Sequence, residues 1–140
     1  MNYWYNIHYI NLLKNMNLVW EQHIMWTRML LISISENLKD LETSQNRLLQ
    51  NPKDIANIFR RFYGIANANI IEKLFTEHLV IGADLITALK NNKQDLAKTL
   101  NDKWYRNADA ISEAFSRINP FYPKEQVRSM ILFFIKKEEI

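Results

Sequence analysis

Apolar residues recur with a helical period along most of the chain, most clearly between Ile65 and Leu89. At 3.6 residues per turn, one broad face of this segment is apolar except for a histidine at its centre. This face also carries Gly82, where a missing side chain would let a neighbouring helix approach closely. We therefore predict a central helix over 65–89, with a face formed by Ile71, Leu74, His78, Ile81, Gly82, Leu85 and Leu89.

The segment Leu18–Leu38 is helical in pattern and apolar almost all round, which predicts a helix in the middle of the fold. Its main stripe again contains a single histidine, His23, among apolar and indole side chains. The stripe consists of Val19, Trp20, His23, Trp26, Thr27, Leu30, Ile34 and Leu38.

Residues 1–15 form an N-terminal extension rich in Tyr and Asn, and they allow two interpretations. Tyr5, Tyr9 and Leu12 continue the stripe of the following helix, which indicates one unbroken helix from about Tyr3 to Leu38. Alternatively, the extension is a separate aromatic arm and Asn17 caps a new helix. We favour the unbroken helix, whose overhanging aromatic residues would provide a homodimer contact.

The remaining elements are marked by proline, asparagine and glycine. Residues 40–50 are expected to form a connector with a helical turn. A short helix then begins at Asn51 and Pro52, with Asn51 as its cap, and ends at Gly64 in a left-handed conformation. After a turn at Asn91 and Asn92, a helix over 93–118 ends before Pro120.

The last helix begins at Pro123, and its expected core face is Val127, Met130, Ile131 and Phe134. Short connections between long helices favour antiparallel neighbours. The predicted fold is therefore all-α: an antiparallel up-and-down four-helix bundle with one extra short helix in the first crossover. We expect residues 1–140 to form a single domain.

Composition supports this fold class and excludes several functions. The chain has only 2 Gly and 3 Pro, too few for a sheet protein with many tight turns, and no Cys for disulfides, thiolate metal sites or a Cys nucleophile. The net charge of +3 comes from scattered residues, so we expect no nucleic-acid partner. No apolar run approaches the roughly 20 residues that span a bilayer, and no signal-peptide pattern is present. We expect a cytoplasmic protein without a membrane partner.

The candidate site residues are polar side chains on apolar helix faces: His23, Thr27, His78 and Asn107. An unpaired buried polar group costs roughly 1–3 kcal/mol, so each should have a partner. One interpretation is a hydrogen-bonded core cluster. The other is a pocket for a small organic ligand, with the same four residues as polar contacts and with aromatic walls supplied by Trp20, Trp26 and Trp104.

A metal site is disfavoured by the spacing of the acidic residues. Di-iron helical bundles need Glu-x-x-His, so that both ligands share one helix face. Glu77 directly precedes His78 and diverges from it by about 100°, and Asp84 lies about 9 Å further along the axis. Glu21 and His23 point to nearly opposite sides. We predict no metal or other cofactor; if a metal were bound, its ligands would be His23, His78 and Glu77.

Catalysis lacks an activated nucleophile, because Ser33, Ser35 and Thr76 have no identifiable base. The chain contains no glycine-rich phosphate loop. His8 is expected to be a surface residue. We therefore assign no catalytic residue and predict a module that binds a small molecule or a protein partner.

The chain contains several short motifs: Trp20-Glu21-Gln22-His23, Trp26-Thr27-Arg28, Asn51-Pro52-Lys53-Asp54, Tyr63-Gly64, Thr76-Glu77-His78-Leu79, Trp104-Tyr105, Asn107-Ala108-Asp109 and Ile118-Asn119-Pro120. These motifs resemble those of a family of small, mostly uncharacterised proteins from spore-forming Firmicutes. The resemblance covers about residues 18–128 and implies an all-helical fold. Members often carry the label acetylglutamate kinase, but amino-acid kinases resemble an α/β sandwich with glycine-rich nucleotide loops, which 2 glycines cannot supply.

Overall fold

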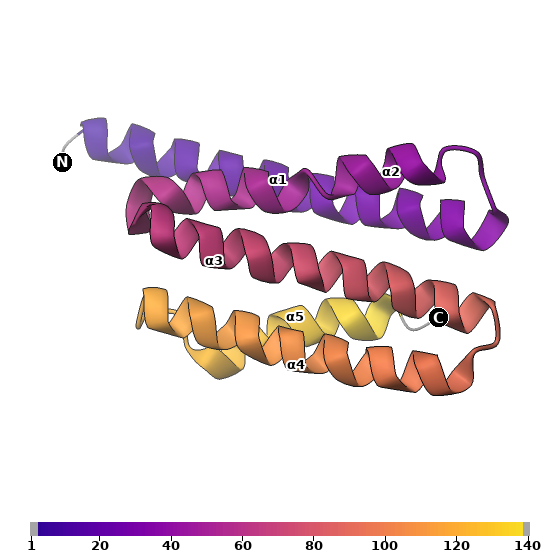
Figure 1. Ribbon diagram of the computed structural model, residues 1–140. Helices are drawn as coiled ribbons and strands as arrows, with labels where there is room; N and C mark the ends of the chain where they lie inside the picture. The colour runs from indigo at the N-terminus through magenta and orange to yellow at the C-terminus, as the bar shows by residue number, and fades with distance from the viewer. Residues whose placement is uncertain (1–2, 139–140) are drawn as a thin grey trace. The chain divides into compact units, whose positions relative to one another are not determined.

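The computed structural model describes residues 3–138, and the side chains of residues 7–132. This part of the chain is all-α (Figure 1), and it divides into unit 1 (Met1–Ala68) and unit 2 (Asn69–Ile140). The predicted fold class is confirmed, since the chain is all-α and its long helical segments run antiparallel within each unit; the single domain stays a prediction. The helices are α1 (Tyr3–Glu36), α2 (Leu41–Leu48), α3 (Asn51–Lys90), α4 (Gln94–Ile118) and α5 (Lys124–Glu138).

In unit 1, the first helix is unbroken from Tyr3 to Glu36, which confirms the favoured interpretation of the N-terminal extension. The second helix packs against α1 and runs in the opposite direction, and the first part of α3 continues that direction (Figure 1). The prediction of a single helical turn over 40–50 was wrong, because α2 is an eight-residue helix.

The turn between α1 and α2 is closed by asparagine in place of glycine. Asn37 has φ 53°, and the N–H of Leu38 donates to the carbonyl of Ser33 at 3.0 Å. This is the hydrogen bond of a Schellman motif, and asparagine tolerates the left-handed conformation better than most residues do. The Ser33 hydroxyl also lies 2.8 Å from the Asp40 carboxylate, which ties the end of α1 to the start of α2.

The third helix is broken at Gly64, as its sequence predicted. Gly64 has φ 79° and ψ 171°, a combination that is essentially restricted to glycine, and it separates the two straight parts of α3. The expected capping role of Asn51 was wrong. Asn51 is the first residue of α3, and its side chain contacts α1 instead.

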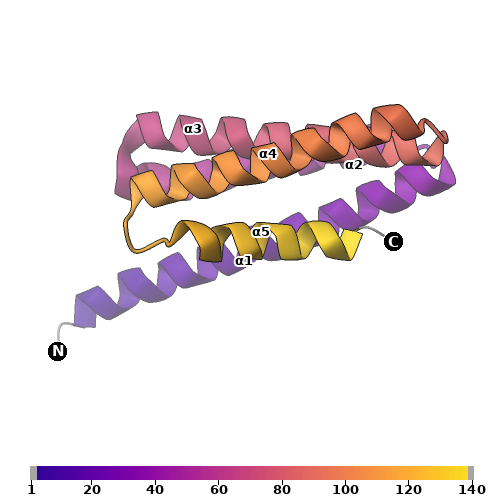
Figure 2. The ribbon, with the colours of Figure 1, turned by 90° about the horizontal axis from the view of Figure 1, so that it is seen from below.

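Unit 2 contains the second part of α3, α4 and α5, and each helix runs antiparallel to the one before it (Figures 1 and 2). The turn after α3 repeats the earlier closure, with Asn92 at φ 55° and the N–H of Lys93 bonded to the carbonyl of Ala88. The fourth helix ends at the predicted position, because Asn119 before Pro120 is extended. The ion pair between Arg128 and Asp109 joins α5 to α4, which pack together.

Burial agrees with the predicted faces except at three positions and on α1. Leu38, Leu89 and Met130 were predicted to face the core, but all three are exposed. Phe134 lies outside the described side chains. The prediction that α1 is surrounded was also wrong, because one of its faces is exposed along most of its length. None of the helices within residues 3–138 combines the length and apolarity needed to cross a membrane.

Candidate functional site

Three of the predicted site residues lie together in unit 2: His78 of α3 with Trp104 and Asn107 of α4. With Leu74 and Gly82 of α3, which contact them, they form what we call the His78 cluster. The Asn107 amide nitrogen donates to the carbonyl of Leu74 at 3.1 Å, so its oxygen faces His78 Nδ1 at 2.8 Å. The imidazole Nδ1 must therefore carry a proton and donate it to Asn107. The predicted hydrogen-bonded polar group in the core is confirmed here.

Trp104 completes this cluster and explains the glycine on α3. Its indole stacks on His78 with ring centroids 5.2 Å apart, and its Nε1 donates to the His78 carbonyl at 3.0 Å. A Cβ atom at Gly82 would lie only 3.2 Å from the indole. The predicted close approach at Gly82 is thus confirmed, and the atom that uses the space is an indole carbon.

Val19, His23 and Asn51 form a similar hydrogen-bonded group in unit 1, which we call the His23 cluster. Asn51 was not predicted as a site residue. The Asn51 amide nitrogen donates to the carbonyl of Val19 at 2.8 Å, and its oxygen lies 3.0 Å from His23 Nδ1. In both units, therefore, an asparagine from another helix bridges a histidine and the carbonyl four residues before it. Asn51 was missed because its place before Pro52 indicated a helix cap.

The other predicted site residues of unit 1 also lie on α1. The Trp20 indole meets the His23 ring edge-on at 5.6 Å, and the Arg47 guanidinium of α2 lies 5.2 Å from the Trp26 ring. The Thr27 hydroxyl is buried and has no hydrogen-bond partner in the described part of the chain. A shared ligand pocket of these residues stays a prediction.

In both clusters, the histidine and asparagine side chains are hydrogen-bonded to each other. Nowhere in the described residues do three or more His, Cys, Asp or Glu side chains gather closely enough to hold a metal ion. Ser33, a considered nucleophile, lies 2.9 Å from the carbonyl of Met29 and beside Asp40, and so is held at the end of α1. Glu77 pairs with the exposed Lys73 and does not reach a histidine.

His23 gives unit 1 a dependence on pH. Burial lowers the pKa of His23 below the ordinary value of 6.5, and the hydrogen bond with Asn51 offsets only part of this effect. The unfolded chain therefore binds a proton at a higher pH than the folded chain does. We expect the free energy of unfolding to be greatest above pH 6.5 and to fall as the pH drops from 6.5 towards the folded pKa.

Urea unfolding at about pH 7.5 and pH 5.5 would measure this effect, with His23→Gln as the comparison. The wild-type protein should lose more stability in acid than the variant, because only the wild type has a titrating group at this position. Equal losses in the two proteins would contradict a depressed pKa at His23.

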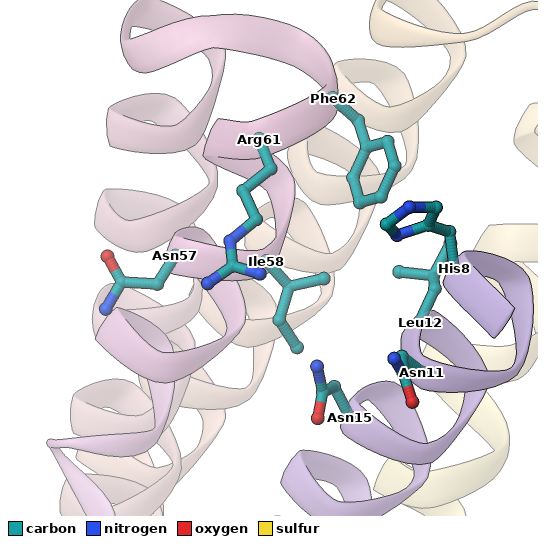
Figure 3. Close-up of a pocket in the computed structure, with 8 residues that line it drawn as sticks. All are labelled: His8, Asn11, Leu12, Asn15, Asn57, Ile58, Arg61 and Phe62. Atoms are coloured by element: carbon teal, nitrogen blue, oxygen red, sulfur yellow. The ribbon is translucent and has the colours of Figure 1, made fainter. Parts of the chain in front are cut away.

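A pocket of about 320 Å³ in unit 1 was not predicted (Figure 3). One wall is formed by α1 through His8, Asn11, Leu12 and Asn15. The other wall is formed by the first part of α3 through Asn57, Ile58, Arg61 and Phe62. His8 is exposed, as predicted, but it also lines this pocket. The sequence carries one signal for this pocket, because polar residues recur at i, i+4 on both helices. The sequence alone does not show that these two helices pack side by side.

A second feature of unit 1 is a row of exposed apolar side chains on α1, which we call the α1 stripe: Ile7, Leu18, Met25, Met29 and Ile32. Their exposed fractions lie between 38% and 52%. At 100° per residue, they fall within an arc of about 60°. Asn11 and Lys14 lie in this arc between Ile7 and Leu18, so the contiguous part of the row runs from Leu18 to Ile32. Single exposed apolar residues are ordinary, but a contiguous row is typical of an interaction surface.

Comparisons of the chain with protein-family models, curated proteins and solved structures find no match. The resemblance to the Firmicutes family, and the kinase label with it, therefore stay predictions. The function is therefore inferred from the geometry within each unit.

Proposed function

We propose that this protein is a helical interaction module that associates with a second copy of itself through the α1 stripe. The observation that carries the proposal is the exposure of five large apolar side chains along one face of α1. The two histidine clusters support a binding role over a catalytic one, because their hydrogen bonds fasten helices together. This proposal moves the expected dimer contact from the aromatic extension to the length of α1.

The pattern of the stripe fits an antiparallel pair of α1 helices with the twofold axis at Met25. Leu18 and Ile32 each lie seven residues from Met25, so Leu18 would face Ile32 of the second copy. The two Met25 side chains would meet at the axis. Leu18 and Ile32 would thus meet on both sides of the paired Met25 side chains, over about four helical turns.

The charged residues beside the stripe are complementary in the same register. Lys14 and Glu36 each lie eleven residues from Met25, so each would face the opposite charge on the second copy. Glu21 and Arg28 lie on the same flank, four residues before and three after the axis, and an antiparallel pair brings them together. None of the four forms an ion pair within the described chain. Such complementarity sets the register of an association more than its strength.

Sedimentation or light scattering over a concentration series tests the proposal. We expect a dimer, and we expect Met25→Glu to weaken it at least about tenfold, because two carboxylates would face each other at the axis. The matched control is Leu89→Glu, a similarly exposed apolar position at the end of α3 in unit 2. It should leave the dimer unchanged.

Charge-reversal variants distinguish association in this register from nonspecific hydrophobic association. Arg28→Glu should weaken the dimer, and the double variant Glu21→Arg with Arg28→Glu should restore it. A protein that stays monomeric at about 100 µM, where an association of roughly −5.5 kcal/mol is half-formed, would contradict the proposal. So would a dimer that Leu89→Glu weakens as much as Met25→Glu.

A further inference from the structure

The pocket between α1 and the first part of α3 has polar walls whose hydrogen-bonding groups are unused. His8, Asn11, Asn15, Asn57 and Arg61 make no hydrogen bond or ion pair with another described residue. All five side chains are exposed. Figure 3 shows Arg61, Asn11 and Asn15 beside the hollow between the two helices, whereas the Asn57 side chain is directed away from α1. Donors that have no partner within the protein and lie beside a hollow are a common property of ligand sites.

The lining favours a ligand with a negative charge. Arg61 carries a fixed positive charge, and no acidic residue lines the pocket. The Asn11 and Asn15 amides add neutral donors on the α1 wall. A guanidinium binds a carboxylate through two parallel hydrogen bonds, which are stronger than bonds between neutral groups.

The position of the pocket along its helices favours a carboxylate over a phosphate. The lining residues lie inside α1 and α3, where each backbone N–H is already bonded within its helix. Phosphate sites commonly use free N–H groups at a helix N-terminus or several cations together. Here only side chains are available, and a single arginine matches a single carboxylate.

The rest of the lining is apolar, which favours a ligand that carries an apolar group as well as a negative charge. Leu12, Ile58 and Phe62 line the space beside the polar groups, and Figure 3 shows the Phe62 ring directed towards His8. A volume of about 320 Å³ is near the lower end for small-molecule sites. It suits a compact organic acid with one apolar or aromatic group.

We infer that this pocket binds a small organic monocarboxylate, with Arg61 and the amides of Asn11 and Asn15 holding the carboxylate and Phe62, Ile58 and Leu12 holding its apolar part. The site lies wholly within unit 1 and does not depend on self-association through the α1 stripe. It assigns a role to polar faces of α1 and α3 that neither histidine cluster uses.

The test is a titration of the ¹⁵N-labelled full chain with phenylacetate, followed by NMR. We expect shifts in the side-chain amide signals of Asn11 and Asn15, with a Kd on the order of 0.1–1 mM for a ligand of this size. Phenylacetamide has the same shape without the charge, and acetate has the charge without the ring. Both should bind at least about tenfold more weakly.

Two neighbouring arginines provide a matched pair of variants. Arg61→Met should weaken phenylacetate binding about tenfold or more, because it removes the charge but keeps the length of the side chain. Arg60→Met removes the same charge one residue away, outside the pocket lining, and should leave the affinity unchanged.

Three results would overturn the inference. The first is the absence of shifts at the pocket amides in the wild-type protein. The second is equal weakening by Arg60→Met and Arg61→Met, which would indicate general charge attraction. The third is tighter binding of phenyl phosphate than of phenylacetate, which would assign the pocket to a phosphate ligand.

Discussion

Replacing Trp104 with alanine should lower the free energy of unfolding by about 3–5 kcal/mol, the largest effect we expect from a single substitution. The indole is 4% exposed, and it combines a stacked contact with His78, a hydrogen bond to the His78 carbonyl and close packing on Gly82. Alanine would leave a cavity between α3 and α4 that the rigid helix backbones cannot fill. Urea unfolding followed by circular dichroism would measure the change.

Phe121 is the control for this substitution, since its side chain is 88% exposed. Phe121→Ala should change stability by no more than about 0.5 kcal/mol. Gly82→Ala adds a test of the contact itself: it should destabilise the wild type, where its Cβ meets the indole, and should be neutral or stabilising in the Trp104→Ala background. A loss below about 1 kcal/mol for Trp104→Ala would contradict its place in the core.

Replacing Asn107 with leucine should cost about 2–4 kcal/mol, although the two side chains are similar in size. The change removes the acceptor for His78 Nδ1–H and the donor to the Leu74 carbonyl, both in a buried site. Asn69→Leu, an exposed asparagine of unit 2, is the matched control and should have a small effect. The same urea unfolding measurement applies to both variants.

A stable Asn107→Leu protein would show that the bridge contributes little beyond its volume. In that case, the hydrogen bonds of the His78 cluster would be satisfied equally well by water in the variant. Loss of stability in Asn69→Leu as large as that in Asn107→Leu would also contradict the argument, because it would indicate a general intolerance of leucine in unit 2.

Most of the fold could be predicted because the helices are long and their boundaries carry strong local signals. Pro120 and Gly64 act on the backbone directly, so the end of α4 and the break in α3 follow from residue chemistry alone. Periodicity also placed His78 and Gly82 on the apolar face of one helix. These inferences required no knowledge of which helix packs against which.

The sequence-based predictions failed where packing decides the outcome. Periodicity shows that α1 is apolar on several sides, but it does not show how many neighbours the helix has, and one side is exposed. Asn51 carries a local signal for a cap, yet its side chain bonds to His23 and Val19. The pocket at Arg61 combines residues that are about 50 positions apart, and no local pattern connects them.

The asparagine bridge determines how His23 responds to acid. Because the amide oxygen of Asn51 accepts from Nδ1, a second proton must enter the imidazole ring at Nε2, on the side away from the bridge. Charging the ring therefore leaves its bond to Asn51 in place. Acid would weaken the packing through the cost of burying an imidazolium, while the register between α1 and the first part of α3 stays the same.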